Sequence, residues 1–173
     1  MLFVVRPATV NEERIGDESP VQQVRRLARE KAEAVPCAPD EVVLAADTVV
    51  VIDGQALGKP TDQAQAAWML GRLSGREHEV ITGICLRTPY RVLVDEETTR
   101  VRFALLSDAE IAAYVATGEP MGKAGAYAIQ GRASAFIDRV EGCYFNVVGL
   151  PVALVSRRLK ELLAWAGTLP GRL

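Results

Sequence analysis

Short apolar runs and amphipathic stretches alternate along the chain, which predicts strands mixed with helices. Valine-rich or alternating segments are typical of strands, and they occur at residues 2–5, 42–46, 48–52, 78–87, 91–104 and 133–137. Helical spacing and start or stop signals predict helices at residues 20–35, 62–74, 107–117 and 152–165. Together these elements are those of an α/β domain.

Local signals sharpen several of these boundaries. Ser19 before Pro20 predicts the start of the first helix, and Thr61 is the predicted cap of the second. Asp53-Gly54 is the turn signal of a β-hairpin. Trp68 is expected in the core, and the only histidine, His78, is expected to have a structural role.

Asp47 stands out because it interrupts two of the most apolar segments without any loop around it. A carboxylate buried in such a run costs free energy unless it is paired or binds a cation. Lys59 follows twelve residues later in a Gly-Lys-Pro turn, and Lys31 lies on the apolar stripe of the first helix. Lys31 either extends along the surface to water or points into a cleft, and the sequence leaves both open.

Composition excludes several classes of protein. The chain has 173 residues, 49% of them hydrophobic, which is enough for one folded domain and argues against disorder. A formal charge of −2 gives no sign of a nucleic-acid polymer as partner, although a single nucleotide needs only a local positive pocket. Three scattered cysteines without a CxxC pair argue against zinc or disulfides and fit the reducing cytoplasm. The apolar N-terminus is too short for a membrane span.

Several polar residues lie in apolar or glycine-rich settings, namely Lys31, Asp47, Thr48, Lys59, Lys123 and Gln130, with Glu12 and Glu13 in an early loop. Lysines neutralise phosphate charge, and carboxylates with phosphates hold a hard divalent cation. An amide such as that of Gln130 donates and accepts, so it can recognise the edge of a base. A triphosphate site is therefore one interpretation, and a few buried ion pairs in an α/β domain are the other. No Walker loop or GxGxxG motif is present.

Six segments in a fixed order favour the first interpretation. They are residues 26–32 (RLAREKA), 45–49 (AADTV), 58–60 (GKP), 73–75 (LSG), 123–131 (KAGAYAIQG) and 146–151 (NVVGLP). With them the chain resembles the Maf family of nucleoside triphosphate pyrophosphatases. The resemblance implies an α/β fold like that of the inosine triphosphatases, with an elongated mixed sheet flanked by helices and a cleft between two lobes. It also implies cleavage to a nucleoside monophosphate and pyrophosphate with a divalent cation, Mg²⁺ or Mn²⁺.

The resemblance assigns roles position by position. Asp47 is expected to accept a proton and to neighbour the metal, and Glu12 to be a second metal or water ligand. Lys31 and Lys59 are expected to hold phosphates, and Lys123 is a further substrate-binding candidate. Thr48 and Gln130 match the positions that mark the dTTP/UTP branch of the family. A homodimer is common in the family and is carried over as an expectation.

The chain departs from the family pattern at its start. The family opens with a strand and a Ser-x-Ser-Pro-Arg-Arg unit, and this sequence begins after that point. The expectation is therefore a single Maf-like domain over residues 1–173, truncated at its N-terminus relative to the family. Two other hypotheses stay open at this stage. One is a non-catalytic nucleotide-binding or regulatory protein related to cell division, and the other is an unrelated structural domain.

Overall fold

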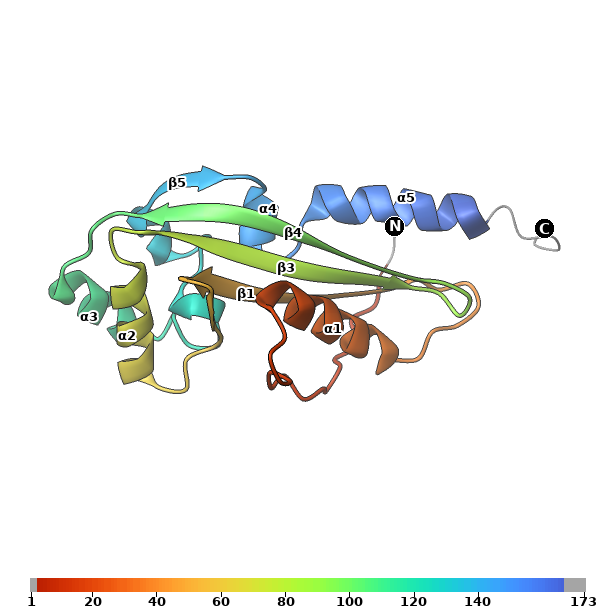
Figure 1. The fold of residues 1–173 in the computed structure, drawn as a ribbon, viewed down its shortest axis with the longest axis horizontal. Coiled ribbons are helices and arrows are strands. Elements are labelled where there is room, and N and C mark those ends of the chain that lie inside the picture. Colours follow the sequence, from red (N-terminus) through yellow and green to blue (C-terminus); the bar gives the residue numbers. More distant parts are fainter. Residues whose placement is uncertain (1–2, 167–173) are drawn as a thin grey trace.

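A five-stranded sheet runs through the computed structural model, which describes residues 3–166 (Figure 1). Its strands are β1 (Val43–Ile52), β2 (Gln55–Leu57), β3 (Glu77–Arg87), β4 (Val92–Phe103) and β5 (Ile137–Glu141). They lie in the order β2-β1-β3-β4-β5, and each neighbouring pair is antiparallel. The α/β class is confirmed, and the sheet of the described residues is antiparallel where the expectation was a mixed one.

Two hairpins, β1–β2 and β3–β4, build most of this sheet, and the sequence predicts the turn of the first. β1 and β2 are joined by Asp53 and Gly54, whose φ values of 53° and 72° belong to the left-handed region. Such values match the type I′ turn that fits the twist of a hairpin. The segments predicted on either side of Asp47 form one continuous strand, so the carboxylate is carried by β1 itself.

The helices are α1 (Pro20–Glu33), α2 (Gln63–Leu73), α3 (Asp108–Ala116), α4 (Tyr144–Val148) and α5 (Val152–Ala166). Figure 1 shows α1 and α5 on opposite sides of the β3–β4 hairpin, with α2 and α3 together at one end. Ser19 caps α1 through a capping box with Gln22. Asp62, not Thr61, caps α2, because its side chain accepts the backbone N–H of Gln65. α4 lies in a segment without a predicted helix.

The alternation of β1 decides which side chains meet α1. Val49 and Val51 pack with Val24 of α1, whereas Val50 and Ile52 belong to the large core on the other face. Asp47 is two residues before Val49, so period-two alternation places it on the α1 side. A Cβ built on Gly83, the β3 partner of Asp47, would be 2.4 Å from the carbonyl oxygen of Val24. The helix therefore approaches the sheet closely beside the carboxylate.

Three further sequence predictions are wrong. The part of the 2–5 strand that falls within the described residues is not a strand: Phe3 is 82% exposed and pairs with no strand there. Residues 132–136 form a short 3₁₀ helix, and β5 begins only at Ile137. Trp68 is half exposed rather than buried, with the Arg72 guanidinium 5.4 Å from its ring centroid. Within residues 3–166, no helix is both long and apolar enough to cross a membrane.

Candidate active site

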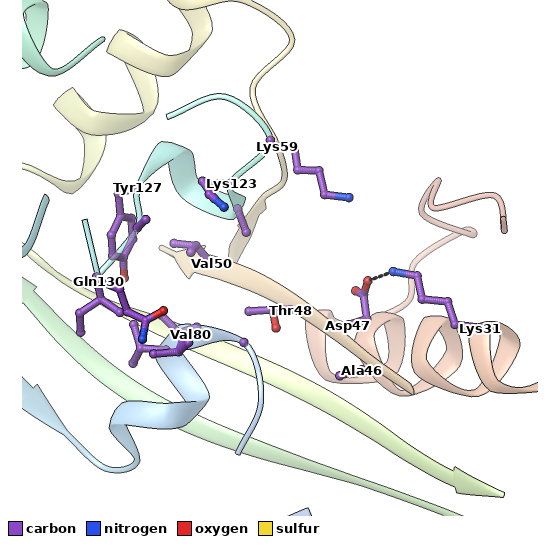
Figure 2. Close-up of a pocket in the computed structure, with 17 residues that line it drawn as sticks. Lys31, Ala46, Asp47, Thr48, Val50, Lys59, Val80, Lys123, Tyr127 and Gln130 are labelled. Carbon is purple, nitrogen blue, oxygen red and sulfur yellow. Dashed lines mark hydrogen bonds and ion pairs between the residues drawn. The ribbon is translucent and has the colours of Figure 1, made fainter. Parts of the chain in front are cut away.

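A cavity of about 310 Å³ opens beside β1. Its walls come from α1, β1, β3, the turn before α2, the 122–130 segment and the end of α4. The polar residues among its lining are Lys31, Asp47, Thr48, Lys59, Lys123, Tyr127 and Gln130. Every site residue expected from the sequence except Glu12 therefore lines this one cavity. Figure 2 shows Asp47 and Lys31 at one end, Gln130 and Tyr127 at the other, and Thr48 between them.

The charged end is a chain of alternating signs. The Lys31 ammonium lies 2.6 Å from Asp47 Oδ1 and 2.8 Å from Glu12 Oε1, and Lys59 lies 2.8 Å from the other oxygen of Glu12. The side chains of Lys31 and Asp47 are only 18% and 13% exposed. Glu12 thus joins the cluster through both lysines, although it lines a neighbouring hollow on the other side of Lys31. Lys31 points into the cleft, which answers the question that the sequence leaves open.

Burial and pairing act against each other in this cluster. Burial raises the pKa of Asp47 above its ordinary value, and the hydrogen bond from Lys31 only partly offsets it. Burial also acts to lower the pKa of Lys31, but its bonds to Asp47 and Glu12 outweigh that and raise it. The two lysines lower the pKa of Glu12 to about 2. Asp47 is therefore the better proton acceptor of the two acids.

Thr48 presents a hydroxyl of defined polarity. Its oxygen is 2.9 Å from the Thr82 hydroxyl, which is fully buried and lies 3.2 Å from the backbone carbonyl of Asn146. A carbonyl only accepts, so Thr82 must give its single proton to Asn146 and accept the proton of Thr48. The Thr48 oxygen then has only lone pairs left for a ligand.

Buried Asn146 holds the cavity wall that α4 provides. Its amide nitrogen donates to the carbonyl of Val80 and to the Thr99 hydroxyl, at 2.9 and 3.0 Å. These bonds fix α4 on the sheet, so that residues 147–149 line the cavity. No role for this wall is predicted from the sequence. The signal was present in the NVVGLP segment, whose asparagine precedes the lining residues.

The end near Gln130 is bounded by an aromatic side chain. Tyr127 lines the cavity, and its hydroxyl is 2.9 Å from Nε2 of His78. Burial lowers the pKa of His78 to about 4, so the ring is neutral at pH 7 and packs between Phe103 and Tyr127. The predicted structural role of His78 agrees with this position. Tyr127 was missed as a lining residue because nothing in its local sequence separates it from a core aromatic.

The glycine-rich segment, residues 122–131, packs closely against the sheet. Gly125 has φ 66°, and a Cβ there would lie 2.8 Å from a methyl group of Val50. Its N–H donates to the carbonyl of Gly58, next to Lys59. At Gly125 this segment therefore approaches β1 closely. It fixes Lys59 and the Lys123–Gln130 segment relative to one another.

Comparison with known proteins identifies the family. The sequence pattern described as Maf-like protein matches residues 1–162. The chain belongs to the Maf family. The dTTP/UTP pyrophosphatase of Koribacter versatilis is 53% identical over 162 residues, covering 93% of this chain and 84% of that protein. That of Symbiobacterium thermophilum is 56% identical over 160 residues, covering 92% and 82%. That of a Geobacillus species is 47% identical over 161 residues, covering 92% and 87%.

The divalent cation that the Maf family implies has a limited set of protein ligands here. Among residues 3–166 no group of three or more His, Cys, Asp or Glu side chains could hold a metal ion. Asp47 and Glu12 nevertheless converge on the same ammonium of Lys31. Mg²⁺ is usually held by one or two carboxylates plus substrate phosphates. The donor set therefore fits a cation that binds together with a nucleotide and not a closed metal site.

Proposed function

We propose that this chain is a nucleoside triphosphate pyrophosphatase that hydrolyses dTTP and UTP to the nucleoside monophosphate and pyrophosphate. The observation that carries the proposal is the polarity of the cavity. Its charged end combines Asp47, Lys31 and Lys59 with Glu12, and its other end presents Gln130. Relatives about half identical to this chain are named dTTP/UTP pyrophosphatase, which supports the same reaction.

The lysines are assigned to the triphosphate. Lys31 and Lys59 already hold a carboxylate between them, and phosphate oxygens are stronger partners of the same kind. Lys123 lines the same cavity and is assigned to the phosphates as well. Binding of nucleotide would exchange Glu12 for phosphate at one or both ammonium groups, which frees the Glu12 carboxylate.

Asp47 is assigned the proton transfer. In the reaction a water attacks the α phosphorus, the bond from that phosphorus to the α–β bridging oxygen breaks, and pyrophosphate leaves with the bond electrons. The water gives its proton to the Asp47 carboxylate, whose burial raises its pKa toward the working pH. A bound Mg²⁺ or Mn²⁺ would neutralise phosphate charge and acidify a water. Asp47 and the released Glu12 would hold it.

Gln130 and Thr48 are assigned to the base. Uracil and thymine share an edge with one N–H donor between two carbonyl acceptors. The Gln130 amide supplies both a donor and an acceptor, and the Thr48 hydroxyl supplies an acceptor only. The amide of Gln130 can meet the N–H and one flanking carbonyl together, whereas the Thr48 oxygen can accept only the N–H.

Product analysis tests the function. The chain is incubated with UTP or dTTP and Mg²⁺ or Mn²⁺, with GTP as a comparison. We expect UMP or dTMP with pyrophosphate in equal amounts, and slower cleavage of GTP. Release of orthophosphate, or nucleotide binding without turnover by folded protein, would contradict the proposal. A cytoplasmic location and a homodimer stay predictions, and light scattering tests the second.

A further inference from the structure

Glu12 is a candidate site residue that lies in a loop and not on a helix or strand. In the part of the chain that the structure describes, residues 3–19 contain neither helix nor strand. Backbone ladders therefore do not fix the position of Glu12, and side-chain contacts must do so. Arg6 holds the N-terminal end of this loop, residues 3–19, by pairing with Glu41 and donating to the carbonyl of Pro36. The other end depends on Arg26.

Arg26 binds the loop at two places. Its Nε and Nη2 atoms donate to the two carboxylate oxygens of Glu18, at 2.9 and 2.7 Å. Nη2 also donates to the backbone carbonyl of Glu13, at 3.0 Å, and this is the residue after Glu12. The side chains of Arg26 and Glu18 are mostly buried. Nη1 donates to Glu30 one turn along α1, which orients the guanidinium.

These bonds differ from the contacts of Glu12 itself in one respect. Glu12 is held by Lys31 and Lys59, and a triphosphate would compete for both ammonium groups. Among the described residues, Arg26 is the remaining side chain of α1 that hydrogen-bonds residues 11–18, and it lies outside the cavity lining. A nucleotide in the cavity would therefore not compete for its bonds.

We propose that Arg26 is a positioning residue that keeps the Glu12 carboxylate at the mouth of the cavity after Lys31 and Lys59 turn to phosphate. This inference rests on the proposed function, because it gives Glu12 its role at the metal. Lysine cannot replace arginine here, since a single ammonium lacks the planar fork that meets Glu18 and the Glu13 carbonyl together.

Arg29 provides a matched control on the same helix. Arg26 pairs with Glu30 and Arg29 pairs with Glu33, both four residues further along α1. The Arg29–Glu33 pair is exposed, and Arg29 makes no hydrogen bond to the loop. Arg26→Met and Arg29→Met therefore lose the same kind of helical ion pair. Only Arg26→Met also loses the hydrogen bonds to Glu18 and to the Glu13 carbonyl.

The test measures UTP hydrolysis against metal concentration, with hydrogen exchange of residues 11–19 in the free protein. We expect Arg26→Met to speed exchange and to lower kcat about a hundredfold, because small misplacements at a reacting centre cost that much. The nucleotide KM should change little, and more metal should be needed for half-maximal rate. Arg29→Met should match the wild type, and Arg26→Lys should restore only part of the loss.

A double-mutant cycle with Glu12→Gln separates positioning from general damage. If Arg26 acts through Glu12, the double variant is no slower than Glu12→Gln alone, because coupled residues are not additive. Additive losses, or a kcat of Arg26→Met equal to that of Arg29→Met, would overturn the inference. If the wild type itself releases no pyrophosphate, the proposed function fails, while hydrogen exchange still decides whether Arg26 holds the loop.

Discussion

The two halves of β1 differ in burial, although their sequences are similarly apolar. Residues 49–52 are buried on both faces, between α1 on one side and the large core on the other. Residues 43–48 are part-exposed, although they are nearly as apolar and continue the same ladder with β3. β2 covers only the buried half, because its three pairs end at Val50.

This difference explains where the site lies. In the open half, Asp47 can reach Lys31 and solvent, and Thr48 can face a cavity. The buried half supplies the rigid support, with Val50 in contact distance of the glycine-rich segment. The candidate site residues of β1 therefore lie in the half of the strand that is not fully buried. The following predictions test this division.

The largest effect is expected from Asp47→Asn in the open half. Loss of a general base typically costs about 10²–10⁴-fold in rate, so pyrophosphate release should fall by that amount. Stability in urea should stay the same or rise, since the buried charge is removed. Asp53→Asn at the other end of the strand is the control: Asp53 is exposed, pairs with Arg72 and Arg76, and should keep its activity. Equal rates for the two variants would remove Asp47 from the chemistry.

Ile52→Ala in the buried half should act on stability instead. Ile52 is 2% exposed in the large core, and such truncations cost about 2–5 kcal/mol of unfolding free energy. Leu44→Ala in the open half should change it by less than about 0.5 kcal/mol, as surface substitutions do. Leu44 is 41% exposed. Urea denaturation of both variants measures the contrast, and similar losses would show that the halves are equally packed.

Gly83→Ala should disturb the junction between α1 and the open half. The new Cβ would lie within 2.8 Å of three backbone atoms of Val24 and Arg25. Overpacking of this kind costs about 1–3 kcal/mol, and the helix must shift with Lys31. Activity should therefore fall together with stability. Gly71→Ala in α2 meets open space and should raise stability by up to about 1 kcal/mol. A stable, fully active Gly83→Ala protein would contradict the close approach.

The smallest effect concerns the pKa of Asp47. Burial raises it above the ordinary 3.8, and Lys31 acts against that rise more strongly than Lys59. Lys31→Met should therefore raise the pKa further, and Lys59→Met should raise it less. Carboxyl-carbon NMR titration measures both without requiring activity. A fall of the pKa in Lys31→Met would contradict the pairing.

The pKa values of Asp47 and Glu12 shift in opposite directions, so the two residues make stability depend on pH with opposite signs. Because the folded-state pKa of Asp47 is raised, its contribution is most favourable below its unfolded pKa and is lost as the pH rises through the folded value. Glu12 has a lowered pKa, so its contribution is present above about 4.5 and is lost as the pH falls toward about 2. Acid titration of unfolding in Glu12→Gln isolates the second contribution.

The sequence by itself determined much of the local structure. The Ser19 cap, the Asp53-Gly54 turn and the run of valines around Asp47 depend on neighbouring residues, so they could be predicted. The segments that carry Lys31, Asp47, Lys59, Thr48 and Gln130 also identified the family, and the structure brings all five side chains to one cavity.

Tertiary structure alone decided how these residues are used. Lys31 could have extended to water; it meets Asp47 because Gly83 lets α1 approach the face to which Asp47 alternates. Phe3–Val5 has the composition of a strand and is none, since pairing needs a neighbour that local pattern does not supply. Arg26 bonds the backbone carbonyl of Glu13, beside Glu12, from thirteen residues along the chain. The sequence shows that burying the Asp47 carboxylate among valines costs free energy. Only the folded chain shows that the Lys31 ammonium partly offsets this cost.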